Sequence, residues 1–252
     1  MNFKFGKLAP KANYKTLRLR NYLHSNAPVV PATQTWDYAF QAWPMDANDT
    51  VGDCTCAAIA HMVMLWTAYQ GKMVRPTTQQ VLEVYSAVTG YDPNQTQPDG
   101  SNPTDNGANI TDILNYWRST GIAGHKIDGW AQIDHTNIQE VKQAIYLFGG
   151  VNPGFQVPQS AMDQNSQGQP WTVVPNDGGI VGGHSVPAFD YSPTGGTVST
   201  WGMKQAFDWN FWLKYMDECY CIISLDWLRQ NGVAPNHLNL AQLEADLKAL
   251  PA

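Results

Sequence analysis

Hydrophobic residues recur along the chain with two different periods, and each period occupies its own half. In the first half they recur every three or four positions, which predicts amphipathic helices. We expect helices at 54–70, 77–90, 109–121 and 137–148, each marked by a capping residue before it or by glycine after it. The first is apolar on almost every face, which is typical of a helix buried inside a domain.

The second half changes to a period of two, which predicts strands. We expect strands at 154–157, 184–191, 197–201 and 219–224, interrupted by a short aromatic helix at 208–216. A last amphipathic helix is expected after Asn239. Helices followed by strands predict an α+β fold with two segregated layers, and the cleft between them is the expected place for a site.

The composition is that of one folded unit, with 43% hydrophobic and only 14% charged residues among 252. Residues 92–107, rich in Pro, Asn, Asp and Gly, are expected to form a long surface loop without the spacing of an EF-hand calcium site. The longest apolar stretch, 56–66, is too short to span a membrane. Without a secretory signal, a cytoplasmic location is expected, with a virion-associated location as the alternative.

The net charge of −6 is unevenly distributed. Six of the fifteen Lys and Arg residues lie in the acid-free first twenty positions, which leaves nine against twenty-one acidic residues, or −12, in the rest. We expect this basic arm to lie across the acidic body of its own chain. The alternative is that it binds a protein partner. A nucleic-acid partner is disfavoured because the acidic body would repel phosphates.

The four cysteines, at 54, 56, 219 and 221, are too few for a disulfide scaffold. They therefore indicate a reducing compartment, with one bridge from Cys56 to the second pair as a minor alternative. The Cys-x-Cys spacing differs from that of zinc sites, so we expect no metal and no other cofactor.

Cys54 and His184 are the candidate chemical pair. A thiol at the start of a helix faces unpaired backbone amides and the positive end of the helix dipole, which favour the nucleophilic thiolate. His184 follows two glycines at the expected start of a strand and lies 130 residues after Cys54. An imidazole left unobstructed by its neighbours can serve as the general base for a thiol. His61 shares the helix of Cys54 but is about 10 Å along its axis, so we expect a core histidine.

The order of these motifs resembles the papain-like cysteine peptidase superfamily. Gly-Asp-Cys at 52–54 is similar to the family's Gly-Ser-Cys, and Gly-Gly-His at 182–184 is similar to its histidine strand. Ser-Thr-Trp-Gly at 199–202 is similar to its Asn-Ser-Trp-Gly. The resemblance spans roughly residues 45–225. The run Asn-Asp-x-x-Gly-Asp-Cys-Thr at 48–55 also resembles a divergent branch of bacterial and bacteriophage proteins.

The resemblance implies one papain-like domain over 1–252, with a helical lobe to about 140, an antiparallel strand lobe over 141–225 and a C-terminal strap over 226–252. It implies a thiol hydrolase that cleaves an amide or peptide bond. Cys54 would attack the carbonyl, and His184 would take and return the proton. The Cys54 amide and the Asn48 side chain would hold the oxyanion, and Ser199 would orient the imidazole.

Three residues depart from the family's pattern, at or beside positions that the resemblance assigns to catalysis. Asn48 is shorter than the family's Gln, Ser199 replaces its Asn, and Asp53 places a carboxylate where its charge would oppose a thiolate. The alternative is therefore an inactive papain-like scaffold that serves as a structural or interaction protein, for example in a bacteriophage assembly. Since the first motif begins by residue 48, no propeptide is expected.

Overall fold

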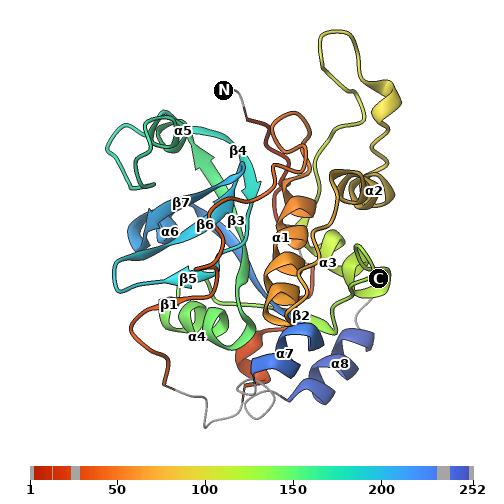
Figure 1. Ribbon diagram of the computed structural model, residues 1–252. Helices are drawn as coiled ribbons and strands as arrows, with labels where there is room; N and C mark the ends of the chain where they lie inside the picture. The colour runs from red at the N-terminus through yellow and green to blue at the C-terminus, as the bar shows by residue number, and fades with distance from the viewer. Residues whose placement is uncertain (1–2, 13, 24–28, 232–238, 250–252) are drawn as a thin grey trace.

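The computed structural model describes residues 3–12, 14–23, 29–231 and 239–249. Helix α1 (Cys54–Tyr69) lies at the centre, with the main sheet on one side and helices α2 (Thr78–Thr89) and α3 (Ile110–Ser119) on the other (Figure 1). Its residues are buried continuously from Cys54 to Thr67. The helix is apolar all round because protein covers every face of it.

The four helices predicted in the first half are confirmed to within two residues. Thr77 and Gln80 form a capping box at the start of α2, and the Asn137 side chain accepts a hydrogen bond from Glu140 N at the start of α4 (Ile138–Phe148). Gly90 and Gly149 end these helices in the left-handed conformation, with φ of 78° and 71°.

The strands form an antiparallel arrangement, so the predicted α+β class is confirmed. The main sheet has the order β2-β8-β3-β4, formed by β2 (Gly129–Gln132), β8 (Met216–Ile223), β3 (Val151–Pro158) and β4 (Ile180–Ser185). Two further pairs are β6 (Gly195–Thr200) with β7 (Met203–Asp208), and β1 (Gln34–Thr35) with β5 (Asp190–Tyr191). The remaining helices are α5 (Gln159–Ser166), α6 (Trp209–Tyr215), α7 (Leu225–Asn231) and α8 (Leu240–Ala249).

The predicted strand at 184–191 is wrong in its bounds. Strand β4 begins at Ile180 and ends at Ser185, Ala188 forms only isolated bridges, and the next strand begins at Asp190. Pro187 lies in the gap, and proline cannot donate a ladder hydrogen bond. His184 therefore lies near the end of its strand and not at the start. Parts of the predicted C-terminal strap, 232–238 and 250–252, lie outside the described residues.

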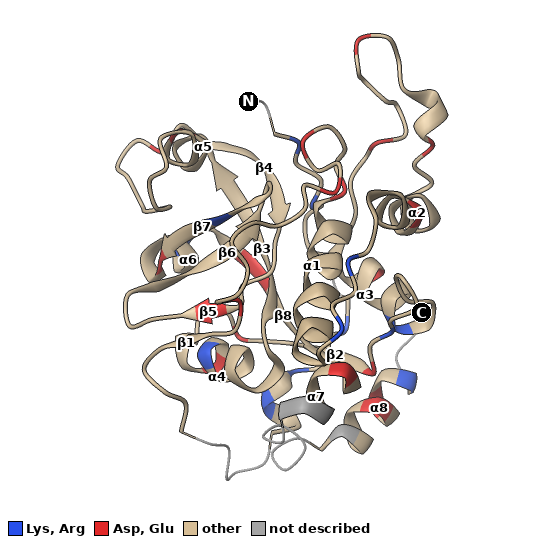
Figure 2. Cartoon of the chain, in the orientation of Figure 1, with Lys and Arg blue, Asp and Glu red and all other residues tan. Residues whose placement is uncertain are grey.

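The basic arm lies on the acidic body of its own chain, as predicted. Lys4 pairs with Asp105, Lys11 pairs with Asp112, and Lys7 pairs with both Asp217 and Glu218. Figure 2 shows the other charged residues spread along the chain in both halves. Residues 92–107 form a long loop, as the composition predicted, with one short 3₁₀ helix at Pro93–Gln95, and part of the loop projects from the body (Figure 1). Among the described residues, the helices are too short or too polar to cross a bilayer.

Candidate active site

Cys54 is the first residue of α1 and is 1% exposed. The backbone amides of Ser185 and Gly6 lie near its sulfur and act to lower the pKa of the thiol. Ser185 directly follows His184 on β4, so the start of the central helix meets the end of the histidine strand. The structure thus brings together the two segments that the sequence pattern singled out.

The His184 ring is fully buried and held from three sides. A hydrogen bond of 2.7 Å joins its Nε2 to Thr200 Oγ1, and its face stacks on Trp201 with 4.4 Å between ring centroids. Phe5 meets the ring edge-on at 5.9 Å. Its other nitrogen, Nδ1, is buried without a hydrogen-bond partner among the described residues. The ring is therefore fixed through Nε2, which leaves Nδ1 open.

Ser199 was expected to orient His184, and the structure corrects this. The Ser199 hydroxyl forms a 2.7 Å hydrogen bond with Nδ1 of His61 instead. Successive side chains on a strand point to opposite faces, so Ser199 and Thr200 on β6 cannot both face His184. His61 Nε2 lies 3.0 Å from the carbonyl of Pro44, and its side chain is 4% exposed. His61 is thus a hydrogen-bonded core histidine, as predicted.

Asn48 lies close to Cys54, as the oxyanion role requires, although it does not face an open cleft. Both residues line a cavity of about 10 Å³, which has room for one water at most. The Asn48 amide donates to Val51 O at 3.3 Å. The site is closed to any substrate in this state of the chain.

Asp53 is completely buried beside Cys54. Burial, assisted by the nearby charge of Asp46, raises its pKa well above the usual range of an aspartate. This favours the neutral carboxylic acid. The full negative charge that the sequence suggested beside the thiol is therefore suppressed by burial.

Burial also sets the protonation of the candidate pair. Desolvation raises the pKa of Cys54 to about 11, and the amides of Ser185 and Gly6 only partly oppose it. Desolvation lowers the pKa of His184 to about 3. At neutral pH this closed site therefore holds a thiol and a neutral imidazole, not the charged pair of an active thiol enzyme.

The cause of this burial is the N-terminal segment, defined here as Phe3–Leu8. It crosses the site in an extended conformation, with Lys7 N donating to Gly183 O at 3.0 Å and Ala108 N donating to Gly6 O at 2.7 Å. Phe3 stacks on Trp201 with 4.5 Å between centroids. The basic arm was expected on the acidic body of the chain, and this part of it lies across the candidate site as well.

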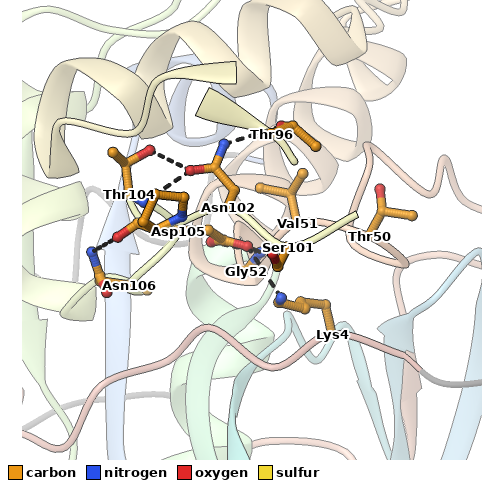
Figure 3. A network of polar contacts seen from close by, with 12 residues as sticks. Lys4, Thr50, Val51, Gly52, Thr96, Ser101, Asn102, Thr104, Asp105 and Asn106 are labelled. Atoms are coloured by element: carbon orange, nitrogen blue, oxygen red, sulfur yellow. Dashed lines mark hydrogen bonds and ion pairs between the residues drawn. The ribbon is translucent and has the colours of Figure 1, made fainter. Parts of the chain in front are cut away.

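Asp105 ties three parts of the site together (Figure 3). Both of its carboxylate oxygens accept from Gly52 N at 3.1 Å, and one accepts from the Tyr85 hydroxyl at 2.7 Å. Lys4 of the N-terminal segment lies 3.6 Å away. The turn before Cys54, helix α2 and the N-terminal segment are thus joined through a single side chain.

The other three cysteines do not line the cavity beside Cys54. Cys56, Cys219 and Cys221 are buried and unpaired. Within the described ranges there is no group of three His, Cys, Asp or Glu side chains with the geometry to hold a metal ion.

Comparison with solved structures identifies the architecture. Xylellain, a cysteine protease from Xylella fastidiosa, superposes with a TM-score of 0.69 at 15% identity, over 89% of this chain and 97% of that one. The chain has a papain-like cysteine protease fold. A Carica candamarcensis cysteine protease gives a TM-score of 0.54 at 13% identity, over 77% of this chain and 99% of that one.

A third papain-like structure, procathepsin B from Trypanosoma congolense, gives a TM-score of 0.56 at 11% identity. That superposition covers 87% of this chain and 85% of the other. No protein-family model matches the sequence, and no curated protein matches it either. At these identities the likeness establishes the papain-like fold, and activity has to be argued from the side chains.

Proposed function

We propose that the protein is a thiol hydrolase of the papain-like type, which cleaves an amide or peptide bond once its N-terminal segment leaves the cleft. The observation that carries the proposal is the packing of the start of α1 against the end of β4, where Cys54 and Ser185, the residue after His184, line the same small cavity. A nucleophile and its base must lie on such facing segments.

In this proposal Thr200 takes the orienting role that was expected of Ser199. Its hydroxyl accepts the hydrogen of Nε2, which fixes the tautomer in which Nδ1 is the free base. Trp201 holds the plane of the ring by stacking on it. Nδ1, which has no partner in the closed state, is then free to take the proton of Cys54.

The reaction follows from these positions. Cys54 Sγ forms a bond to the substrate carbonyl carbon while its proton passes to His184, and the oxyanion receives hydrogen bonds from the Cys54 amide and the Asn48 side chain. The C–N bond then breaks as His184 gives the proton to the leaving amine. Water, deprotonated by His184, releases the acyl group and restores the thiol.

Removal of the N-terminal segment would change the protonation state as well as the access. Water that enters the cleft would remove the desolvation that raises the pKa of Cys54 and lowers that of His184. The helix start and the Ser185 amide would then favour thiolate, and its charge would favour imidazolium.

The full-length Lys7→Glu variant tests this proposal, because a carboxylate cannot remain beside Asp217 and Glu218. We expect it to hydrolyse a small p-nitrophenyl ester faster than the wild-type chain and than Lys7→Arg. Adding Cys54→Ala should abolish the gain. If Lys7→Glu is no faster than its Cys54→Ala form, the proposal fails.

The second candidate is an inactive scaffold, and the filled cleft favours it. In the described state both Cys54 and His184 are buried and uncharged, and the cavity beside them admits no substrate. A chain that keeps this state under all conditions would act only as a structural or interaction protein. The same variants distinguish the two candidates, since a scaffold gains no ester hydrolysis on opening.

A further inference from the structure

The N-terminal segment lies in a trough whose walls are built of glycine. Three glycines line the trough where the segment passes closest, and a side chain at any of them would collide with it. A Cβ on Gly183 would lie 2.1 Å from Lys7 O, and a Cβ on Gly182 would lie 2.5 Å from the Phe5 ring. A Cβ on Gly107 would lie 2.4 Å from Gly6 O. Gly107 also has a φ of 77°, which favours glycine. The trough is therefore shaped for an extended backbone.

The two walls of the trough offer backbone hydrogen bonds to that chain. Gly183 O accepts from Lys7 N, while Ala108 donates to Gly6 O and accepts from Leu8 N at 3.0 Å. These groups pair with any sequence because they belong to the main chain. Recognition through main-chain pairing is the means by which extended peptides add to a sheet edge, with side-chain pockets supplying the specificity.

One side-chain pocket opens from this trough, and Lys7 fills it completely. The Lys7 side chain is 0% exposed, and its ammonium lies 2.8 Å from Asp217 and 3.1 Å from Glu218. A third acceptor is Leu8 O, at 3.2 Å. Gly154 forms the wall, since a Cβ there would lie 2.1 Å from Cε of Lys7.

The acids of this pocket are held in place independently of Lys7. Gln156 donates to Asp217 at 2.6 Å, and the Tyr220 hydroxyl donates to Glu218 at 2.7 Å. Glu218 is 2% exposed, so an empty pocket would leave a buried carboxylate without a cation. Burying an unpaired charge is costly, so the pocket selects a cationic side chain.

We propose that this trough is the peptide-binding site of the protein and that the pocket of Glu218, Asp217 and Gly154 selects a lysine or arginine side chain of the bound peptide. The N-terminal segment occupies the position of a bound peptide, and Lys7 occupies the position of the residue that the pocket selects. The inference rests on the proposed function for the nature of the substrate, but its test measures binding and needs no turnover.

The test uses the full-length Lys7→Glu chain and a fluorescent peptide with the sequence of residues 2–9, Asn-Phe-Lys-Phe-Gly-Lys-Leu-Ala. The peptides compared carry lysine, arginine or norleucine at their sixth position. We expect the lysine and arginine peptides to bind about thirtyfold more tightly than the norleucine peptide. Adding Glu218→Gln should remove most of this preference, while Glu83→Gln, a change of an exposed acid on α2, should leave it intact.

Trypsin cleavage at Lys4 shows whether the segment has left the trough, and Phe5→Ser is added to Lys7→Glu if it has not. Once cleavage is seen, a norleucine peptide that binds as tightly as the lysine peptide overturns the proposal. Failure of every peptide to bind overturns it as well. A clear lysine preference in a chain that hydrolyses no ester would support the pocket while refuting the proposed catalysis.

Discussion

Nε2 of His184 and Oγ1 of Thr200 lie 2.7 Å apart, and both residues are buried. Because this hydrogen bond uses Nε2, Nδ1 is the ring nitrogen that has no hydrogen-bond partner among the described residues. Ser199, one residue earlier on β6, points to the opposite face and bonds to His61. Thr200, and not Ser199, is thus the hydrogen-bond partner of His184.

Replacing Thr200 by valine should lower kcat about tenfold in the Lys7→Glu chain, the equivalent of one lost hydrogen bond. Valine keeps the volume and the strand preference, so KM should change little. Thr200→Ser keeps the hydroxyl and should retain most of the activity. Steady-state kinetics on the small ester measure both. An equal loss in the serine and valine variants would mean that packing, and not the hydrogen bond, matters.

Replacing Ser199 by alanine should affect stability more than turnover. The change leaves Nδ1 of His61 buried without its partner, which should lower the free energy of unfolding by about 1–3 kcal/mol. Urea denaturation measures this, with the exposed Ser101→Ala as the control. The kcat of the opened chain should change less than with Thr200→Val, and the opposite order of effects would restore Ser199 to the catalytic group.

Lys7 should contribute far more to stability than other lysines of the arm. Lys7→Glu removes the cation of a buried ion pair, which should lower the free energy of unfolding by about 3 kcal/mol or more. Lys11 pairs with Asp112 at the surface, so Lys11→Glu should cost less than about 1 kcal/mol. Matched urea curves compare the two variants. Equal effects would show that the segment is not anchored through Lys7.

Asp53 should give stability an unusual dependence on pH. Its pKa in the folded chain is raised above the unfolded value of 3.8, so its contribution is fully present below that value and is lost as the pH rises through the folded pKa. Asp53→Asn removes this loss. We therefore expect the difference in Tm between Asp53→Asn and the wild type to shift in favour of the variant as the pH increases from 4 to 8. The same difference for the exposed Asp163→Asn should stay constant. A constant Tm difference would refute the raised pKa.

Much of this fold could be predicted from local patterns. The four helices of the first half carry their own capping residues and glycine stops, so their bounds follow from nearby sequence. Strand β2 is only four residues long and is defined by its pairing with β8, a partner far along the chain. No local period could reveal it.

The site shows the same division. The spacing predicted that the segments of Cys54 and His184 would meet, and helix α1 does pack against strand β4. The charge pattern predicted that the basic arm would lie on the acidic body of its own chain. Whether Ser199 or Thr200 faces the histidine depends on the register of β6, which a shift of one residue reverses. The occupied cleft and the buried place of Lys7 depend on contacts between residues more than one hundred positions apart.

The central claim is that Cys54 and His184 act as nucleophile and base once the N-terminal segment leaves. Acylation of the full-length Lys7→Glu chain by a p-nitrophenyl ester, followed by mass spectrometry of the peptide that contains Cys54, tests this most directly. We expect a rapid burst of one acyl group per chain on Cys54, a slow reaction in the wild-type and Lys7→Arg chains, and a strongly reduced rate when His184→Ala is added. An opened chain that shows no acyl group on Cys54, or that is acylated equally fast without His184, would contradict the claim.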